Sequence, residues 1–316
     1  MFPLCCDDSL KRHAPHEKVN SDTETFVLPG LPDDNIKFSK RQLPFWYTAK
    51  ADLEHLQDNR QEAESKTYGV IVNSFYDLEP AYAKYFKDEV GKKLWLAGPV
   101  CLFNKENEQK TERGEKNSVD GGTVLNWLNS KEPKDMLEYG GDEKNNEGGE
   151  GRGGKKLPDG FEERMMKSGK GLIVRSWAPQ LLILEHQAIG GFMTHCGWNS
   201  AIEGIGAGVP MITWPITAEH FFIESLVTDV LKTGIRVGNE EWMWLFWEPK
   251  VTVTRDKVEE AVKWLMGGGG GGDEAEKMRM RAKEFGEKAK KAVDYGGSSH
   301  ADVIALINDL KSRQSA

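Results

Sequence analysis

The chain has 316 residues, of which 29% are charged and 38% are hydrophobic, and its formal net charge is −8. This length allows two domains, or one large domain with a sizeable core. The negative charge, together with the lack of a basic stripe interleaved with aromatics, argues against nucleic acid as the main partner. No apolar run approaches the length of a membrane span or a signal peptide, so we expect a cytoplasmic protein.

The four cysteines give no sign of a metal site or of a disulfide framework. Cys5 and Cys6 are adjacent, whereas Cys101 and Cys196 are isolated, and no CxxC pair occurs. A redox-active vicinal pair is one reading of Cys5 and Cys6. Free thiols in a reducing cytosol are the simpler reading, and this is our expectation.

The first third of the chain contains one recognisable structural unit. Residues 1–67 are polar and turn-rich, and LPGLPDD (28–34) has the composition of a loop. Residues 69–72 predict a buried strand, residues 78–86 a helix, and residues 94–100 a second strand that ends in a Gly-Pro turn. The prediction is therefore a single strand–helix–strand unit.

Two glycine-rich tracts interrupt the second part of the chain. Residues 134–156 contain almost no apolar side chains among dense charge, which predicts disorder without a strand. The six glycines at 267–272 predict a flexible connector. Between these tracts strands alternate with helices, which predicts a parallel, doubly wound sheet. The expected strands are 171–175, 191–194, 211–214 and 235–237, and the expected helices are 180–185, 198–206 and 218–231.

Apolar residues recur at helical spacing in the third of these helices and in the tail. Phe222, Leu226 and Val230 are four residues apart, as in a buried helical stripe. Two further stripes predict tail helices, one formed by Met278, Ala282, Phe285 and Ala289 and the other by Val303, Leu306, Ile307 and Leu310.

The stretch THCGWNSAIEGIGAGVP (194–210) lies where a strand is expected to lead into a helix. Ligands of doubly wound sheets bind at such places, and the N–H groups of a helix N-terminus favour an anion. Asn199 and Ser200 can add side-chain donors to a phosphate, and Glu203 can accept hydrogen bonds from sugar hydroxyls. Each residue alone also fits an ordinary role, such as a helix cap. Together they favour a nucleotide.

The segment from WAPQ (177–180) to Glu219-His220 resembles the donor-binding signature of plant secondary-product UDP-glycosyltransferases. GFEERM (160–165), VNSFYDLEP (72–80), AGPV (97–100) and GGSS (296–299) extend the resemblance. It implies an α/β, GT-B-like fold, with the doubly wound parallel sheet of a C-terminal Rossmann-like domain and a partial N-terminal domain. Together with the two glycine-rich tracts, it divides the chain into an acceptor-domain remnant (1–98), a linker with the first donor-domain helix (99–133), a disordered tract (134–156), a UDP-sugar-binding domain (157–266), a glycine linker (267–272) and C-terminal helices (273–316).

The resemblance also implies a role for each residue of the signature. Trp177 is expected to stack on uracil, and the backbone of Ala178 to meet the base. Gln180 and Glu203 are expected to hold the ribose. The diphosphate would lie against His195, Asn199 and Ser200, and the sugar against Trp198, Glu219 and His220. A helix N-terminus with fixed donors can stabilise the departing diphosphate, so no metal and no other cofactor is expected.

The chain departs from the family pattern in three places. The family's general base, a His with an Asp partner, should lie in an N-terminal segment that this sequence lacks, and none of the seven histidines (13, 16, 55, 186, 195, 220 and 300) has a matching context. After NWLNSKEP (126–133), the glycine-rich tract replaces a strand, a Gly-Ser loop, a helix and another strand. The signature ends in His220 instead of Gln, a change linked within the family to galactose preference and equally readable as a tolerated variant. Neutral His offers one donor and one acceptor.

These observations support an enzyme that transfers a sugar, glucose above all, from a UDP-sugar to a hydroxyl of a small lipophilic acceptor, with inversion. We expect it to act as a monomer. The alternative is an inactive remnant that at most binds UDP-sugar or a partner. A Rossmann-type dehydrogenase is excluded because no G-x-G-x-x-G follows a strand. The aromatic run EEWMWLFWEP (240–249) suggests either an acceptor pocket or apolar packing without a partner.

Overall fold

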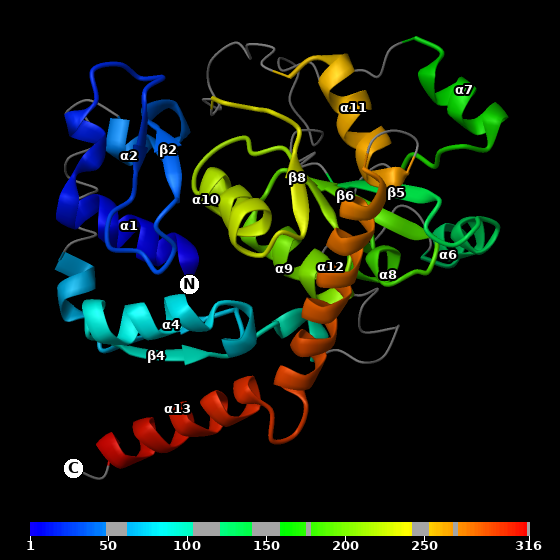
Figure 1. Cartoon of the computed structure of the whole chain (residues 1–316). Helices are drawn as coiled ribbons and strands as arrows, with labels where there is room; N and C mark the ends of the chain where they lie inside the picture. Colours follow the sequence, from blue (N-terminus) through cyan, green and yellow to red (C-terminus); the bar gives the residue numbers. More distant parts are fainter. Residues whose placement is uncertain are drawn as a thin grey trace, which may run out of the picture.

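The computed structural model describes residues 1–48, 62–103, 121–140, 159–174, 178–241, 253–267 and 271–314 (Figure 1). The strands in these ranges are β1 (Thr25–Val27), β2 (Lys37–Ser39), β3 (Gly69–Val72), β4 (Lys93–Leu96), β5 (Met136–Gly140), β6 (Ile189–Thr194), β7 (Met211–Thr213) and β8 (Gly234–Arg236). The α-helices are α1 (Phe2–His13), α2 (Phe45–Thr48), α4 (Pro80–Tyr85), α6 (Gly121–Asn129), α7 (Phe161–Ser168), α8 (Gln180–Leu184), α9 (Trp198–Ala207), α10 (His220–Ser225), α11 (Arg255–Met266), α12 (Gly272–Val293) and α13 (Ser298–Gln314). Short π-helical turns, Phe86–Val90 and Leu226–Val230, extend α4 and α10.

The larger sheet is parallel throughout, with the strand order β5-β6-β7-β8. Its central strand β6 is buried at every residue, as expected for a strand covered on both faces. Helix α9 lies very close to one face, where a Cβ atom at Gly204 would be only 3.1 Å from the Phe192 ring. On the other face, a Cβ atom at Gly191 would meet Leu265 of α11 at 2.9 Å. The predicted doubly wound sheet is therefore confirmed.

Two predictions for this sheet were wrong. The glycine-rich tract 134–156 was expected to contain no strand, but β5 lies within it and pairs with β6 in parallel. Two apolar residues, Met136 and Leu137, are sufficient for a strand at this place. β5 lies at the end of the strand order and takes its backbone hydrogen bonds from its neighbour β6. Conversely, residues 171–174 of the expected strand 171–175 lie outside any ladder. Residues 141–158 and 175–177 lie outside the described residues, and so do residues 268–270 of the expected connector. At the two ends of that connector, Gly267 ends α11 at φ +89° and Gly272 begins α12.

The N-terminal segment is more ordered than its polar composition predicts. Residues 2–13 form α1, which buries Phe2, Cys5, Cys6 and Leu10. At its start, the amino group of Met1 lies 2.8 Å from the carboxylate of Glu79, and both groups are fully buried. The turn-rich prediction was wrong for this helix and for the β1–β2 hairpin, whereas the loop at 28–34 is confirmed. Cys5, Cys6, Cys101 and Cys196 are all buried free thiols.

The predicted strand–helix–strand unit is present, with β3 and β4 parallel and α4 between them in sequence. The chain returns to this unit at its other end, because α13 packs along β4. Figure 1 shows the long helix α12 descending from the larger sheet to α13, which runs beneath α4 and β4. Asp302 of α13 accepts a hydrogen bond of 2.7 Å from the backbone N–H of Leu96, and Ser299 donates to the carbonyl of Gly98.

The predicted tail helices are confirmed as α12 and α13, although they differ in burial. Met278, Ala282 and Ala289 of α12 are buried, as a core-facing stripe requires. On α13, however, Ile307 and Leu310 remain 41% and 48% exposed. Within the described residues, no helix has both the length and the apolar character needed to cross a membrane.

Candidate functional site

The predicted site occupies the turn between β6 and α9. Strand β6 ends at Thr194, Cys196 adopts a left-handed backbone conformation at φ +68°, and Gly197 caps α9 without a side-chain hydrogen bond. The first N–H groups of α9 therefore emerge at the carboxyl edge of the parallel sheet. Asn199 is exposed there and Ser200 is half-buried, so both can reach a ligand. This is the geometry of an anion site at a helix N-terminus.

Gln180 and Glu203, which were predicted to hold a ribose together, are in direct contact. Gln180 is the first residue of α8, and its Nε2 atom donates a hydrogen bond of 2.8 Å to Oε2 of Glu203 on α9. Ala178 lies two residues before Gln180 and is half-buried. The pair thus presents amide and carboxylate groups beside the β6–α9 turn. Trp177, the predicted uracil partner, lies outside the described residues.

His195 and His220 meet at the other side of this turn. Their ring centroids are 5.0 Å apart, with an interplanar angle of 65°. Nδ1 of His220 accepts backbone N–H groups from Thr217 at 3.2 Å and from Ile216 at 3.4 Å. The acceptor nitrogen of His220 is therefore already used by the backbone, and the proton of the neutral ring lies on Nε2. Glu219 is half-buried at the start of α10 beside this pair.

Trp198 connects α9 to the two-stranded sheet of β3 and β4. Its indole N–H donates a hydrogen bond of 2.8 Å to the backbone carbonyl of Asn73, directly after β3. The side chain of Asn73 in turn accepts from the backbone N–H of Val100 at 2.9 Å. The indole N–H of Trp198 is thus used within the protein. A contact from Trp198 to a sugar would have to come from its backbone or from the ring itself.

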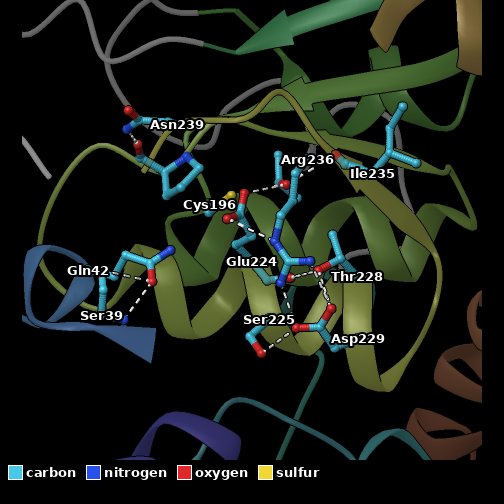
Figure 2. A network of polar contacts seen from close by, with 12 residues as sticks. Ser39, Gln42, Cys196, Glu224, Ser225, Thr228, Asp229, Ile235, Arg236 and Asn239 are labelled. Atoms are coloured by element: carbon cyan, nitrogen blue, oxygen red, sulfur yellow. Dashed lines mark hydrogen bonds and ion pairs between the residues drawn. The ribbon is translucent and has the colours of Figure 1, made fainter. Parts of the chain in front are cut away.

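A partly buried ionic network lies behind the site and was not predicted from the sequence (Figure 2). The Glu224 carboxylate accepts a hydrogen bond of 2.7 Å from Thr213 on β7 and an ion pair of 3.2 Å from Arg236 on β8. Arg236 also binds both oxygens of Asp229, at 2.8 and 2.5 Å, and Ser225 donates to Asp229 at 2.8 Å. These contacts fix α10, and with it His220 at its first residue, against two strands of the sheet.

The charge state of Glu224 reflects a balance of burial and pairing. Glu224 is only 1% exposed, and burial raises its pKa to about 7 despite the opposing effects of Thr213 and Arg236. For Asp229, burial also acts to raise the pKa, but the hydrogen bonds and charge of Arg236 outweigh it and lower the pKa. Burial, followed by the charge of Glu224, raises the pKa of the Cys196 thiol. The thiol is therefore neutral and structural.

Three other described histidines, His16, His186 and His300, take part in local contacts. The His16 ring lies 5.4 Å from Tyr47, and burial lowers the pKa of His16. His186 hydrogen bonds with Asn129 at 3.0 Å, and His300 packs against Tyr295. His55 lies outside the described residues, as do residues 242–252 of the aromatic run. No group of three His, Cys, Asp or Glu side chains that could hold a metal ion occurs among the described residues.

Comparisons with known proteins place this site in context. A family model described as UDP-glucoronosyl and UDP-glucosyl transferase matches residues 159–228. The chain is 46% identical to an abscisate beta-glucosyltransferase of Phaseolus angularis, with 100% of this chain and 72% of the relative aligned. It is 44% identical to UDP-glucose flavonoid 3-O-glucosyltransferase 7 of Fragaria ananassa, over 98% of this chain and 68% of that protein.

Solved structures show the same likeness. The crystal structure of Glycyrrhiza uralensis UGT73P12, complexed with glycyrrhetinic acid 3-O-monoglucuronide, superimposes with a TM-score of 0.88 at 36% identity. That match covers 98% of this chain and 67% of the other. Medicago truncatula UGT71G1, complexed with UDP-glucose, matches with a TM-score of 0.74 at 26% identity, over 97% of this chain and 68% of the other.

Proposed function

Since the chain belongs to the plant family 1 UDP-glycosyltransferases, we propose that it transfers a glucosyl group from UDP-glucose to a hydroxyl of a small lipophilic acceptor, with inversion. The family's GT-B fold and its transferase activity are established by these relatives. In the proposed reaction, the acceptor oxygen forms a bond to the anomeric carbon while the bond from that carbon to the diphosphate breaks. The electron pair leaves with UDP, and the hydroxyl proton passes to a base.

The observation that carries the proposal is the arrangement of donor-site groups around the β6–α9 turn. The N-terminus of α9 can stabilise the charge that develops on the departing diphosphate, with Asn199 and Ser200 as side-chain donors. The Gln180–Glu203 pair offers both a donor and an acceptor to the ribose hydroxyls. We therefore propose transfer without a metal ion. We also propose that the chain acts as a monomer in the cytoplasm.

His220 bears on the choice of sugar. Because its Nδ1 atom accepts two backbone N–H groups, the neutral ring can only donate to a sugar hydroxyl, whereas a Gln in its place could also accept. Glucose is proposed because relatives at 44–46% identity are named as glucosyltransferases. Galactose is the alternative, and parallel assays with UDP-glucose and UDP-galactose compare the two directly.

A second candidate function is UDP-sugar binding without transfer. It is favoured by the contacts of His16, His186 and His300, whose rings are engaged with Tyr47, Asn129 and Tyr295. The general base is consequently not assigned to any of them. Under this alternative the donor site would still bind UDP but would release no glycoside.

Thermal unfolding with and without millimolar UDP, followed by a transfer assay, tests the proposal. UDP at 100 times its Kd should stabilise the native chain by about 2.7 kcal/mol and raise the midpoint accordingly. Abscisate, a flavonoid and glycyrrhetinic acid are suitable first acceptors because they appear in the names of relatives and neighbours. A midpoint that UDP leaves unchanged would contradict the donor site, and a raised midpoint without any glycoside would favour the binding-only alternative.

A further inference from the structure

Glu138 adds a second carboxyl group to the face of the sheet that carries the donor site. In the parallel ladder of β5 and β6, Glu138 lies opposite Phe192, whose ring points toward α9. Leu137, one residue earlier, points to the opposite face, where it packs against Gly191 beside α11. Because side chains alternate along a strand, Glu138 is directed toward α9 and its carboxylate Glu203.

The Glu138 side chain is half-buried, and one oxygen of its carboxyl group is unsatisfied. Its Oε2 atom is shielded from solvent and has no hydrogen-bond partner in the described part of the chain. Burial, followed by the negative charge of Glu203, raises the pKa of Glu138 to about 8. A buried polar group without a partner costs about 1–3 kcal/mol, so a ligand that supplied the missing hydrogen bond would gain affinity.

The described helices and strands around Glu138 offer no cation to hold it ionised. Among the described elements, β6 and α8 pack against β5, and neither contributes a charged side chain. On α9 the one titratable group is Glu203, which accepts a hydrogen bond from Gln180 at 2.8 Å. Gln180, Glu203 and Glu138 therefore form a cluster with two carboxyl groups. In this cluster the neutral acid form is favoured for Glu138.

We propose that Glu138 is a further donor-site residue, which hydrogen bonds the nucleoside next to the Gln180–Glu203 pair and is a neutral carboxylic acid when UDP is bound. This inference rests on the proposed function, because it requires UDP at this site. Bound UDP would cover the group from water and bring a diphosphate anion close to it, and both effects disfavour the carboxylate. A neutral carboxyl can both donate to and accept from a ribose hydroxyl, whereas the ionised form only accepts.

Calorimetric titration of the full chain with UDP from pH 6.5 to pH 9.5 tests the proposal. The Kd of the unmodified chain should rise above pH 8, approaching tenfold per pH unit, because the group must take up a proton on binding. Glu138→Gln should keep the affinity at pH 7 within about threefold and remove this rise, since an amide mimics the neutral acid. Glu138→Ala should lose about fivefold or more at pH 7, since its hydrogen bond is gone.

Two controls separate the effect of Glu138 from other titrations. Glu132→Gln changes an exposed carboxylate on the segment that leads into β5, and it should follow the unmodified chain at every pH. The ionisation of UDP itself is common to all variants and cancels in the comparison. A measurement without any variant is the binding enthalpy at pH 8 in buffers of different ionisation enthalpy, where about half a proton should be taken up per UDP.

The proposal that Glu138 is protonated when UDP is bound would be overturned by either of two results. One is that the unmodified chain and Glu138→Gln give superimposable pH profiles, and the other is that no proton is taken up at pH 8. Glu138→Ala binding UDP as tightly as the unmodified chain at pH 7 would overturn the hydrogen bond to the nucleoside. Failure of the unmodified, folded chain to bind UDP at any pH would refute the proposed function, and this inference with it. The outcomes are therefore distinguishable.

Discussion

Replacing Arg236 with Met tests how the buried carboxylate of Glu224 is held. Removing one partner of a buried ion pair costs about 3–5 kcal/mol when the remaining charge stays buried. The Glu224 side chain is 2% exposed, but that of Arg236 is 42% exposed, so solvent screens part of the interaction. We therefore expect the free energy of unfolding of R236M to be lower by about 2 kcal/mol at pH 8.

The same loss should be much smaller at pH 5. The native pKa of Glu224, about 7, is above its ordinary value of 4.5, so the native state binds this proton more tightly than the unfolded state. The favourable contribution of the protonated group is therefore lost as the pH rises through 7. Without the Arg236 cation the native pKa rises further, and each unit of that rise adds about 1.4 kcal/mol to the loss at high pH. At pH 5 Glu224 is neutral in both proteins, and the variant loses only the partly exposed Asp229 pair, about 0.5 kcal/mol.

Urea unfolding followed by tryptophan fluorescence at pH 5 and pH 8 measures both quantities. The matched control introduces R236M into an E224Q background, where the residue at 224 cannot titrate. We expect the two pH values to give the same loss in that background. A loss from R236M that is equal at pH 5 and pH 8 in the natural background would refute the reasoning, and so would a pH-dependent loss that survives E224Q.

Three further predictions concern the donor site. Trp177→Ala and Glu203→Ala should each weaken UDP binding by about 1–3 kcal/mol, through lost stacking and unpaired ribose hydroxyls, and unchanged affinity by calorimetry in both would contradict the donor pose. Trp198→Phe keeps an aromatic ring but removes the N–H group that donates to the Asn73 carbonyl at 2.8 Å. The free energy of unfolding in urea should therefore fall by about 1 kcal/mol, and an unchanged value would show that this hydrogen bond contributes nothing to stability. EDTA should leave transfer unchanged, because the α9 N-terminus is proposed to stabilise the diphosphate, and a loss of product restored by Mg²⁺ would refute the metal-free proposal.

The sequence predicted the larger sheet best where periodicity and burial agree. Strand β6 and helix α9 carry an apolar run followed by helical spacing, and they lie within two residues of the predicted bounds. Strand β5 could not be found in the same way. Only its partner β6 supplies the hydrogen bonds that make Met136 and Leu137 a strand, and this pairing joins residues about 50 positions apart.

Helix α1 was missed for a related reason. Half of its residues are polar, yet Phe2, Cys5, Cys6 and Leu10 form a buried face, and contacts with the β3–α4 unit stabilise it. Of the candidate site, the Gln180–Glu203 and His195–His220 contacts follow from residues that the signature singles out. The Glu224–Arg236 network and Glu138 have no local pattern, because their chemistry depends on burial and on neighbours from other strands.

The contact between β4 and α13 has a consequence for biosynthesis. Leu96 and Asp302 are 206 positions apart, so a ribosome that has just released β4 must still make the whole larger sheet before α13 emerges. Until then the N–H group of Leu96 lacks its carboxylate, and the surface that α13 covers remains open to solvent and to chaperones. The β3–β4 sheet is therefore synthesised before the larger sheet but completed after it. A nascent chain stalled between α12 and α13 should carry a folded larger sheet joined to an unfinished β3–β4 unit.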